Sequence, residues 1–125
     1  GARLIQKYNM EVIPTGYILL DGGVISSASS VSQTDPLSME NKDRVLEHVL
    51  AGEYMGNKLI YLDCGSGANQ SVTGELLSYI SKQVDIPIVV GGGVKSLSQA
   101  KQMYQYGASY IVIGNALENN QYINQ

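Results

Sequence analysis

Glycines and carboxylates follow four apolar segments of this sequence, at the points where strands would end. The four groups are Asp21–Gly22–Gly23, Asp63–Cys64–Gly65–Ser66–Gly67, Gly91–Gly92–Gly93 and Gly114–Asn115. In parallel α/β folds, ligands bind at the carboxyl ends of the strands. Glycine at such a place lets the backbone approach a ligand and present its N–H groups, and the N-terminus of the following helix favours an anion. The pattern therefore predicts an anion site.

The last two of these groups are the more specific signal. Gly91–Gly93 and Gly114–Asn115 follow successive strands, as do the two loops that bind phosphate in many barrels of eight β/α units. The alternative is that these glycines only make tight turns between strand and helix. Two consecutive loops, each preceded by a run of Ile and Val, favour phosphate over that alternative.

Tyr61 and Asp63 are two residues apart on one strand-like segment, so both side chains point to the same side of the sheet. A carboxylate at the end of a barrel strand can accept hydrogen bonds from substrate hydroxyls, or act as a base. The alternative is that Asp63 caps the next helix. Asp21 ends its own segment similarly, but a Gly22–Gly23 turn explains it equally well.

Three further reactive residue types lack the neighbours that catalysis needs. Cys64 has no His or cation nearby in sequence, so we interpret it as a small filler. His48 falls within a helical segment, where it suits the surface or packing. Ser66 lies in a Gly-Ser-Gly context that is not a nucleophile elbow, and no His follows it. No set of His and Cys has metal-ligand spacing, so no metal ligand is assigned.

The elements that must position these residues alternate between strand and helix. The predicted strands are Val12–Asp21, Lys58–Asp63, Ile86–Val90 and Tyr110–Ile113. The predicted helices are the tail Ala2–Tyr8, then Asn41–Met55, Thr73–Gln83 and a segment from Ser96 or Ser98 to Tyr106, ended by Gly107. Glu118–Gln125 is too short and polar for an assignment. Strands joined by helices predict a parallel sheet with right-handed crossovers.

Helical spacing also predicts which side chains face the sheet. The inward sets are Val45, Leu46, Val49 and Leu50 in the first complete helix, Leu76, Leu77 and Ile80 in the second, and Ala100, Met103 and Tyr104 in the third. The longest connection, Gly22–Glu40, is rich in serine. Connections of this length are commonly functional or disordered.

Size and composition limit the class of protein. The 125 residues suit one domain, or half of an eight-unit barrel of ~250 residues. A net charge of −3 without a basic cluster excludes the electrostatic footprint of a nucleic-acid binder. A single cysteine excludes an intramolecular disulfide and suits a reducing, cytoplasmic setting. No apolar run reaches the ~20 residues of a membrane helix, and no signal peptide is visible.

Four stretches together resemble a known family. They are EVIPTGYILLDGG from Glu11, YLDCGSGA from Tyr61, PIVVGGGVKS from Pro87 and GASYIVIGNALE from Gly107. They resemble geranylgeranylglyceryl phosphate synthase and its bacterial heptaprenyl relative. The resemblance implies an α/β fold in which residues 1–125 form units five to eight, the C-terminal half, of a modified TIM barrel.

The resemblance also implies an activity. The family transfers a prenyl group from a prenyl diphosphate to the 3-hydroxyl of sn-glycerol 1-phosphate, giving an ether lipid precursor. Tyr61 and Asp63 would be catalytic and would hold the glycerol hydroxyls, although the family usually has Glu at the position of Asp63. The phosphate would be bound by Gly91, Gly92, Gly93, Gly114 and Asn115, and Gly65 would be a further contact to the glycerol 1-phosphate.

The remaining implications concern the cofactor and the partners. Mg²⁺ would assist departure of the diphosphate, with its ligand on the family's first strand, which has no counterpart here. The Gly22–Glu40 loop resembles the loop near the prenyl groove. A homo-oligomer and peripheral membrane contact would fit a lipid-forming enzyme.

Two alternatives remain at this point. One is another phosphate-binding barrel enzyme that acts on a different phosphorylated metabolite, against which the YLDCGSGA stretch argues. The other is a non-catalytic half-barrel that pairs with a second copy to cover its open sheet edges.

Overall fold

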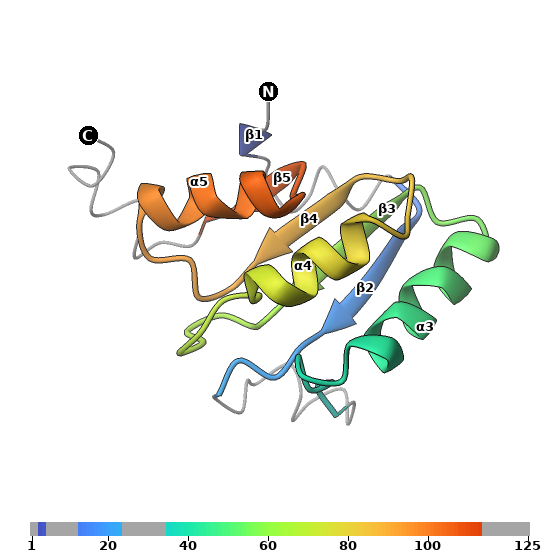
Figure 1. Cartoon of the computed structure of the whole chain (residues 1–125), viewed down its shortest axis with the longest axis horizontal. Coiled ribbons are helices and arrows are strands. Elements are labelled where there is room, and N and C mark those ends of the chain that lie inside the picture. The colour runs from blue at the N-terminus through green and yellow to red at the C-terminus, as the bar shows by residue number, and fades with distance from the viewer. Residues whose placement is uncertain (1–2, 5–12, 24–34, 114–125) are drawn as a thin grey trace.

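The computed structural model describes residues 3–4, 13–23 and 35–113, which form one parallel sheet with helical crossovers (Figure 1). The strands are β1 (Arg3–Leu4), β2 (Thr15–Leu19), β3 (Leu59–Asp63), β4 (Ile88–Gly91) and β5 (Tyr110–Val112). The helices are α3 (Lys42–Tyr54), α4 (Gly74–Ser81) and α5 (Leu97–Tyr106). The strand order is β1-β5-β4-β3-β2, and every pair is parallel. The predicted α/β fold with parallel strands is confirmed.

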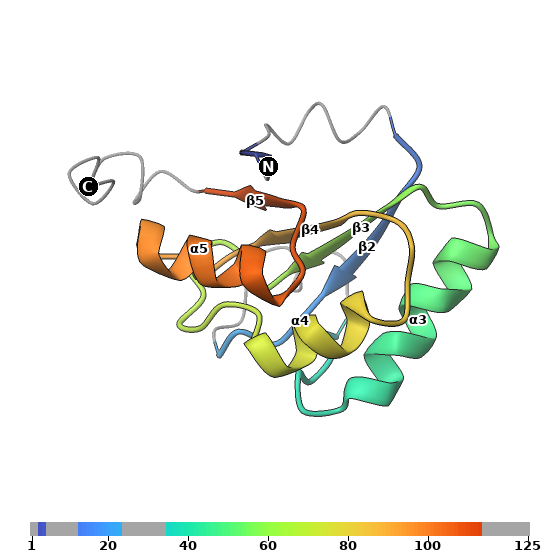
Figure 2. The same cartoon turned by 45° about the horizontal axis from the view of Figure 1, so that its top comes forward.

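The three helices lie on the same face of the sheet, as Figures 1 and 2 show from two directions. The main core fills the space between these helices and the sheet. It contains Val45 and Val49 from α3, Leu76, Leu77 and Ile80 from α4, and Ala100 and Met103 from α5. Alternate strand residues meet them, among them Ile60, Leu62, Val90 and Ile111. Because side chains alternate along a strand, the residues between these point to the opposite face.

That opposite face, here called the open face, carries a second and smaller cluster. Leu59, Tyr61 and Val89 are buried there, and Tyr110 and Val112 pack against them. The register places Tyr61 beside Tyr17 on β2 and beside Val89 on β4. It likewise places Asp63 between Leu19 and Gly91. The pairing of the strands therefore brings side chains of β2, β3 and β4 together near the carboxyl end of the sheet.

Three details differ from the sequence-based expectations. Arg3–Leu4 is not helical: it pairs with Tyr110 and Ile111, so the expected helix Ala2–Tyr8 is wrong there. A short helix has a costly nucleus, whereas the edge of β5 offers unpaired backbone groups. β2 is shorter than Val12–Asp21, and it starts after Pro14, which has no N–H to donate. Leu50 is 40% exposed, because only Val45 and Val49 on α3 reach the core completely.

The helix ends follow the expected signals. Ser96, rather than Ser98, caps α5, since its Oγ accepts the Gln99 N–H at 3.0 Å. Thr73 caps α4 by accepting the Leu76 N–H at 3.2 Å. Gly107 ends α5 with a φ of 124°. These caps satisfy N–H groups that have no partner inside a helix.

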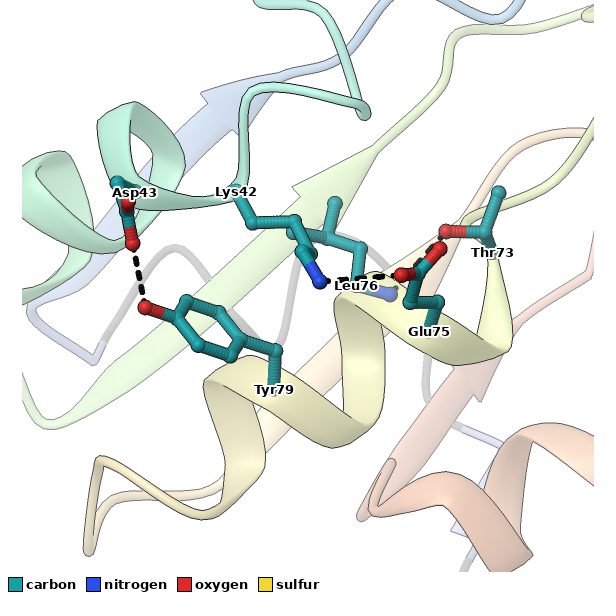
Figure 3. A network of polar contacts seen from close by, with 6 residues as sticks. All are labelled: Lys42, Asp43, Thr73, Glu75, Leu76 and Tyr79. Atoms are coloured by element: carbon teal, nitrogen blue, oxygen red, sulfur yellow. Dashed lines mark hydrogen bonds and ion pairs between the residues drawn. The ribbon is translucent and has the colours of Figure 1, made fainter.

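The N-terminal end of α3 is joined to α4 by contacts between polar side chains (Figure 3). Lys42 Nζ lies 3.0 Å from a carboxylate oxygen of Glu75 and 5.2 Å from the centre of the Tyr79 ring. The Tyr79 hydroxyl donates to Asp43. Solvent-exposed contacts of this kind contribute little energy each, so they mainly fix the relative placement of the two helices.

We predict that Gly107→Ala destabilises the protein by more than Gly56→Ala. Both glycines have positive φ, of 124° and 107°, so both substitutions carry backbone strain of about 1–2 kcal/mol. At Gly107 the new Cβ would also lie 2.4 Å from Ser81 Oγ, whereas nothing lies within 4 Å at Gly56. This overlap adds about 1–3 kcal/mol. Urea unfolding of the two variants measures the difference, and equal losses would contradict the packing at Gly107.

Candidate functional site

The candidate site is a hydrogen-bonded cluster on the open face. The Tyr17 hydroxyl donates to Asp63 Oδ2, and the Gly65 N–H donates to Asp63 Oδ1 at 2.8 Å. The Tyr17 and Tyr61 rings meet edge to face, with centroids 5.3 Å apart and an interplanar angle of 68°. Tyr61 and Asp63 thus lie on the same side of β3, and both oxygens of the carboxylate are held by donors.

Asp63 does not cap the next helix, because α4 begins at Gly74 and its cap is Thr73. Its bond to Gly65 instead closes a local turn directly after β3. The Gly65 N–H, expected to bind substrate, is therefore engaged by Asp63. A carboxylate oxygen has two lone pairs, so Asp63 Oδ2 can accept another hydrogen bond beside that from Tyr17.

Tyr17 is a polar residue that our sequence analysis did not single out. It lies within the apolar strand β2, is 49% exposed, and is paired in register with Tyr61. The sequence places Tyr17 on the same face of its strand segment as Asp21 at the end of that segment. Whether Tyr17 takes part in the site, however, depends on which residue of β3 lies opposite it. Strand register is a tertiary property, so the sequence pattern alone did not supply it.

The two tyrosines are held in the protonated form. Burial is the first cause that raises the pKa of Tyr17, and its hydrogen bond to Asp63 and the charge of Asp63 add to it. Burial also raises the pKa of Tyr61, with the charge of Asp63 as the second cause. Near neutral pH both hydroxyls therefore remain donors next to a carboxylate.

The glycine loop after β4 lies against the loop after β3. Gly92 and Gly93 have φ values of 87° and 74°. A Cβ on Gly92 would lie 2.7 Å from the Gly65 backbone, and one on Gly93 would lie 2.5 Å from the Gln70 carbonyl oxygen. A Cβ on Gly91 would lie 2.6 Å from the Tyr61 hydroxyl. Turn geometry and close approach thus account for glycine at all three positions.

The same loop also offers backbone donors. Within the described ranges, no acceptor is found for the N–H groups of Gly92 and Gly93. Successive N–H groups in a turn of this kind make a concavity suited to an anion, and α5 starts shortly afterwards. Glycine at these positions therefore fits both a tight turn between strand and helix and a backbone site for an anion. Gly114 and Asn115, the second part of the predicted phosphate site, lie outside the described residues.

The other candidates have structural explanations. Asp21 Oδ1 accepts the Gly23 N–H at 2.9 Å, as expected for a turn. Cys64 is buried, with its sulfur 3.8 Å from that of Met39, and burial raises the pKa of its thiol to about 12, helped by the charges of Asp63 and Asp21. It is a packing residue, as predicted. His48 and Ser66 are exposed.

A separate cavity of about 420 Å³ lies near the N-termini of α3 and α4. Its walls are Asp21, Gly23, Ser38, Met39, Glu40, Gln70, Thr73 and Glu75. Of the predicted site residues only Asp21 contributes to it. In the described part of the chain, no group of three or more His, Cys, Asp or Glu side chains could hold a metal ion. In the same part, no helix is long and apolar enough to cross a membrane.

A parallel sheet with helices on one face, and with polar and glycine residues at its strand ends, is the arrangement of a segment of a β/α barrel. The chain belongs to the PcrB family, whose sequence model matches residues 1–125. A geranylgeranylglyceryl phosphate synthase of Flavobacterium johnsoniae is 48% identical over 120 residues, covering 96% of this chain and 49% of that protein. One of Pyrococcus furiosus is 37% identical over 119 residues, covering 95% of this chain and 47% of that protein.

Solved structures agree with the sequence relatives. The wild-type synthase of Thermoplasma volcanium superposes with a TM-score of 0.79 at 32% identity, over 89% of this chain and 44% of that one. The Thermoplasma acidophilum synthase, crystallised with sn-glycerol 1-phosphate, superposes with a TM-score of 0.78 at 28% identity, over 90% of this chain and 47% of that one. The chain thus spans about half the length of these relatives, which is consistent with half of a barrel.

We predict that the stability of the protein falls in alkaline solution through Tyr17 and Tyr61. Their pKa values are raised above the ordinary ~10, so the unfolded state loses these protons first as pH rises. The two tyrosines contribute fully to the stability below pH ~10, and this contribution is lost as the pH rises through their pKa values in the folded state. Unfolding measured at several alkaline pH values tests this.

Asp63→Asn provides the control for the alkaline experiment. It removes one charge beside both tyrosines but leaves their burial unchanged, so part of the upward shift in their pKa values should disappear. Tyrosinate absorbance followed during a pH titration sums all nine tyrosines, so the difference between the wild-type and variant curves isolates the tyrosines that sense Asp63. Identical titration curves for the wild type and Asp63→Asn would contradict the contact between Asp63 and the two tyrosines.

Proposed function

We propose that this chain is part of a prenyltransferase that joins a prenyl group from a prenyl diphosphate to the 3-hydroxyl of sn-glycerol 1-phosphate. The observation that carries the proposal is the cluster of Tyr17, Tyr61 and Asp63 beside the Gly91–Gly93 loop. A fixed carboxylate next to an anion-binding loop suits a small molecule with hydroxyls at one end and phosphate at the other. Membership of the PcrB family supports the same substrate.

Asp63 would orient the reacting hydroxyl and accept its proton. The oxygen of that hydroxyl forms a bond to the first prenyl carbon, while the bond from this carbon to the diphosphate breaks. The proton moves to a carboxylate oxygen that Tyr17 and Gly65 hold in place. Holding the hydroxyl in this way lowers the entropic cost of bringing it to the prenyl carbon. Tyr61 would contribute a second hydroxyl to hold the glycerol.

The phosphate of the substrate would be held by backbone N–H groups of Gly92 and Gly93, with Gly114 and Asn115 as further expected contacts. Backbone donors do not titrate, so any pH dependence of binding in this part of the site would come from the phosphate itself, whose second pKa is about 6. Gly91 would act by leaving room for the Tyr61 hydroxyl, because any side chain there would collide with it.

Mg²⁺ is the expected cofactor, and it would neutralise the departing diphosphate. The described residues do not provide a group of ligands for it. The ligands for the metal are therefore expected on a strand that precedes these units in the barrel.

The remaining parts of the proposal concern the setting of the enzyme. We expect residues 1–125 to form units five to eight of one barrel domain, in a cytoplasmic homo-oligomer that contacts a membrane at its periphery. Native mass measurement addresses the oligomeric state and the length of the protein together.

The direct test is turnover with sn-glycerol 1-phosphate, prenyl diphosphates of several lengths and Mg²⁺. We predict that Asp63→Asn lowers the rate by about 10²–10⁴-fold, which is the usual contribution of a positioned base. Asp85→Asn is the matched control, because Asp85 is exposed and lies away from the cluster, and it should have no effect. Product analysis by mass spectrometry identifies the ether.

Two results would redirect the proposal. Turnover of another phosphorylated metabolite, without ether formation, would favour a different phosphate-binding barrel enzyme. Binding of phosphate by a protein that transfers no prenyl group of any length would favour a non-catalytic half-barrel.

A further inference from the structure

The side chain of Gln99 joins the two loops that carry the candidate site. Its Oε1 accepts the Lys95 N–H at 2.8 Å, and its Nε2 donates to Ser71 Oγ at 2.8 Å. Lys95 lies in the loop after β4, and Ser71 lies in the loop after β3. Ser71 is also the buried polar residue of the described core, with 8% of its surface exposed.

Gln99 is positioned for this contact by the cap of α5. Ser96 caps the helix and accepts the Gln99 N–H, so the sequence Ser96-x-x-Gln99 has the form of a capping box. In the usual box the side chain three residues on returns to the N–H of the cap residue. Here the side-chain oxygen of Gln99 reaches one residue further back and accepts the Lys95 N–H, while its amide nitrogen donates to Ser71 in the neighbouring loop.

The two loops also touch without side chains. Gly92 lies against the Gly65 backbone, and Gly93 lies against the Gln70 carbonyl oxygen. The glycines let the two loops approach closely, but they do not fix the orientation of one loop relative to the other, because glycine has wide conformational freedom. Among the described residues, Gln99 is the side chain that hydrogen-bonds to both loops at once.

We propose that Gln99 is a positioning residue that fixes the Gly91–Gly93 loop against the loop carrying Gly65 and Ser71, and thereby sets the phosphate-binding geometry relative to Asp63. The inference rests on the proposed function, because it assigns the Gly91–Gly93 loop to phosphate. A bifunctional amide is suited to this position, since it accepts from a backbone N–H at one atom and donates to a hydroxyl at the other. A loosened loop would lose affinity for the phosphate end of the substrate.

The test compares Gln99→Met with Gln102→Met on the same helix. Methionine has nearly the length of glutamine but replaces neither hydrogen bond, and Gln102 is exposed. Calorimetric titration with inorganic phosphate should show binding weakened about tenfold in Gln99→Met, as for the loss of one or two hydrogen bonds, and unchanged in Gln102→Met. In turnover assays, KM for sn-glycerol 1-phosphate should rise by a similar factor, whereas kcat and KM for the prenyl diphosphate stay near the wild-type values.

Ser71→Ala gives a second and milder variant. It removes the bond between the loops but leaves the Gln99–Lys95 bond intact, so we expect phosphate binding weakened about threefold. The double variant Ser71→Ala, Gln99→Met should bind no more weakly than Gln99→Met alone, because both changes break the same bridge. If Gln99→Met does not fold, as judged by urea unfolding, the Ser71→Ala result decides the question.

The outcomes separate the inference from the proposed function. Wild-type affinity for phosphate in both Gln99→Met and Ser71→Ala would overturn the positioning role, as would equal weakening in Gln102→Met. A wild-type protein that binds phosphate without prenyl transfer would overturn the proposed activity, and the phosphate titrations would still decide the role of Gln99. A wild-type protein that binds no phosphate would overturn both.

Discussion

The parallel register of β2, β3 and β4 is the constraint on which the rest of the site depends. It pairs Tyr17 with Tyr61 and places Asp63 between Leu19 and Gly91. A shift of one residue in a strand would turn its whole set of side chains to the other face. Tyr17 would then lie in the core under the helices, and Ile18 would lie beside Tyr61. The main core opposes such a shift, because Ile60, Leu62 and Val90 are completely buried between the sheet and the helices.

Among the described residues, the carboxylate of Asp63 is oriented by neutral donors and not by a cation. Asp63 is held by one hydroxyl and one backbone N–H, both neutral donors. These contacts leave lone pairs on the carboxylate for a substrate hydroxyl. The same arrangement raises the pKa values of Tyr17 and Tyr61, because burial and the nearby charge of Asp63 both disfavour the negatively charged tyrosinate.

Gly92 and Gly93 allow close packing of two loops and also expose backbone N–H groups. Gly92 and Gly93 allow two loops to approach within contact distance, and the same backbone turn exposes successive N–H groups. Such loops need an additional element that holds them, since glycine itself restricts the chain very little. In this protein the neighbouring side chains of Ser96 and Gln99 provide that restraint through the start of α5.

The sequence by itself determined the parallel α/β class, the three helices with the end of α5 at Gly107, and the shared side of Tyr61 and Asp63, but it left the cap of α5 open between Ser96 and Ser98. These follow from local periodicity, capping chemistry and the alternation of side chains along a strand. It also indicated that Cys64 packs in the interior and that glycines end the strands. The family resemblance to the prenylglyceryl phosphate synthases likewise came from local motifs.

Tertiary structure decided the features that depend on which segments become neighbours. The part played by Tyr17 follows from strand register, the strand at Arg3–Leu4 from the free edge of β5, and the exposure of Leu50 from the placement of α3 over the sheet. The engagement of the Gly65 N–H by Asp63 and the bridge made by Gln99 likewise depend on how loops fold back on the strands and on each other. Such contacts join residues through space, and no periodic pattern along the chain encodes them.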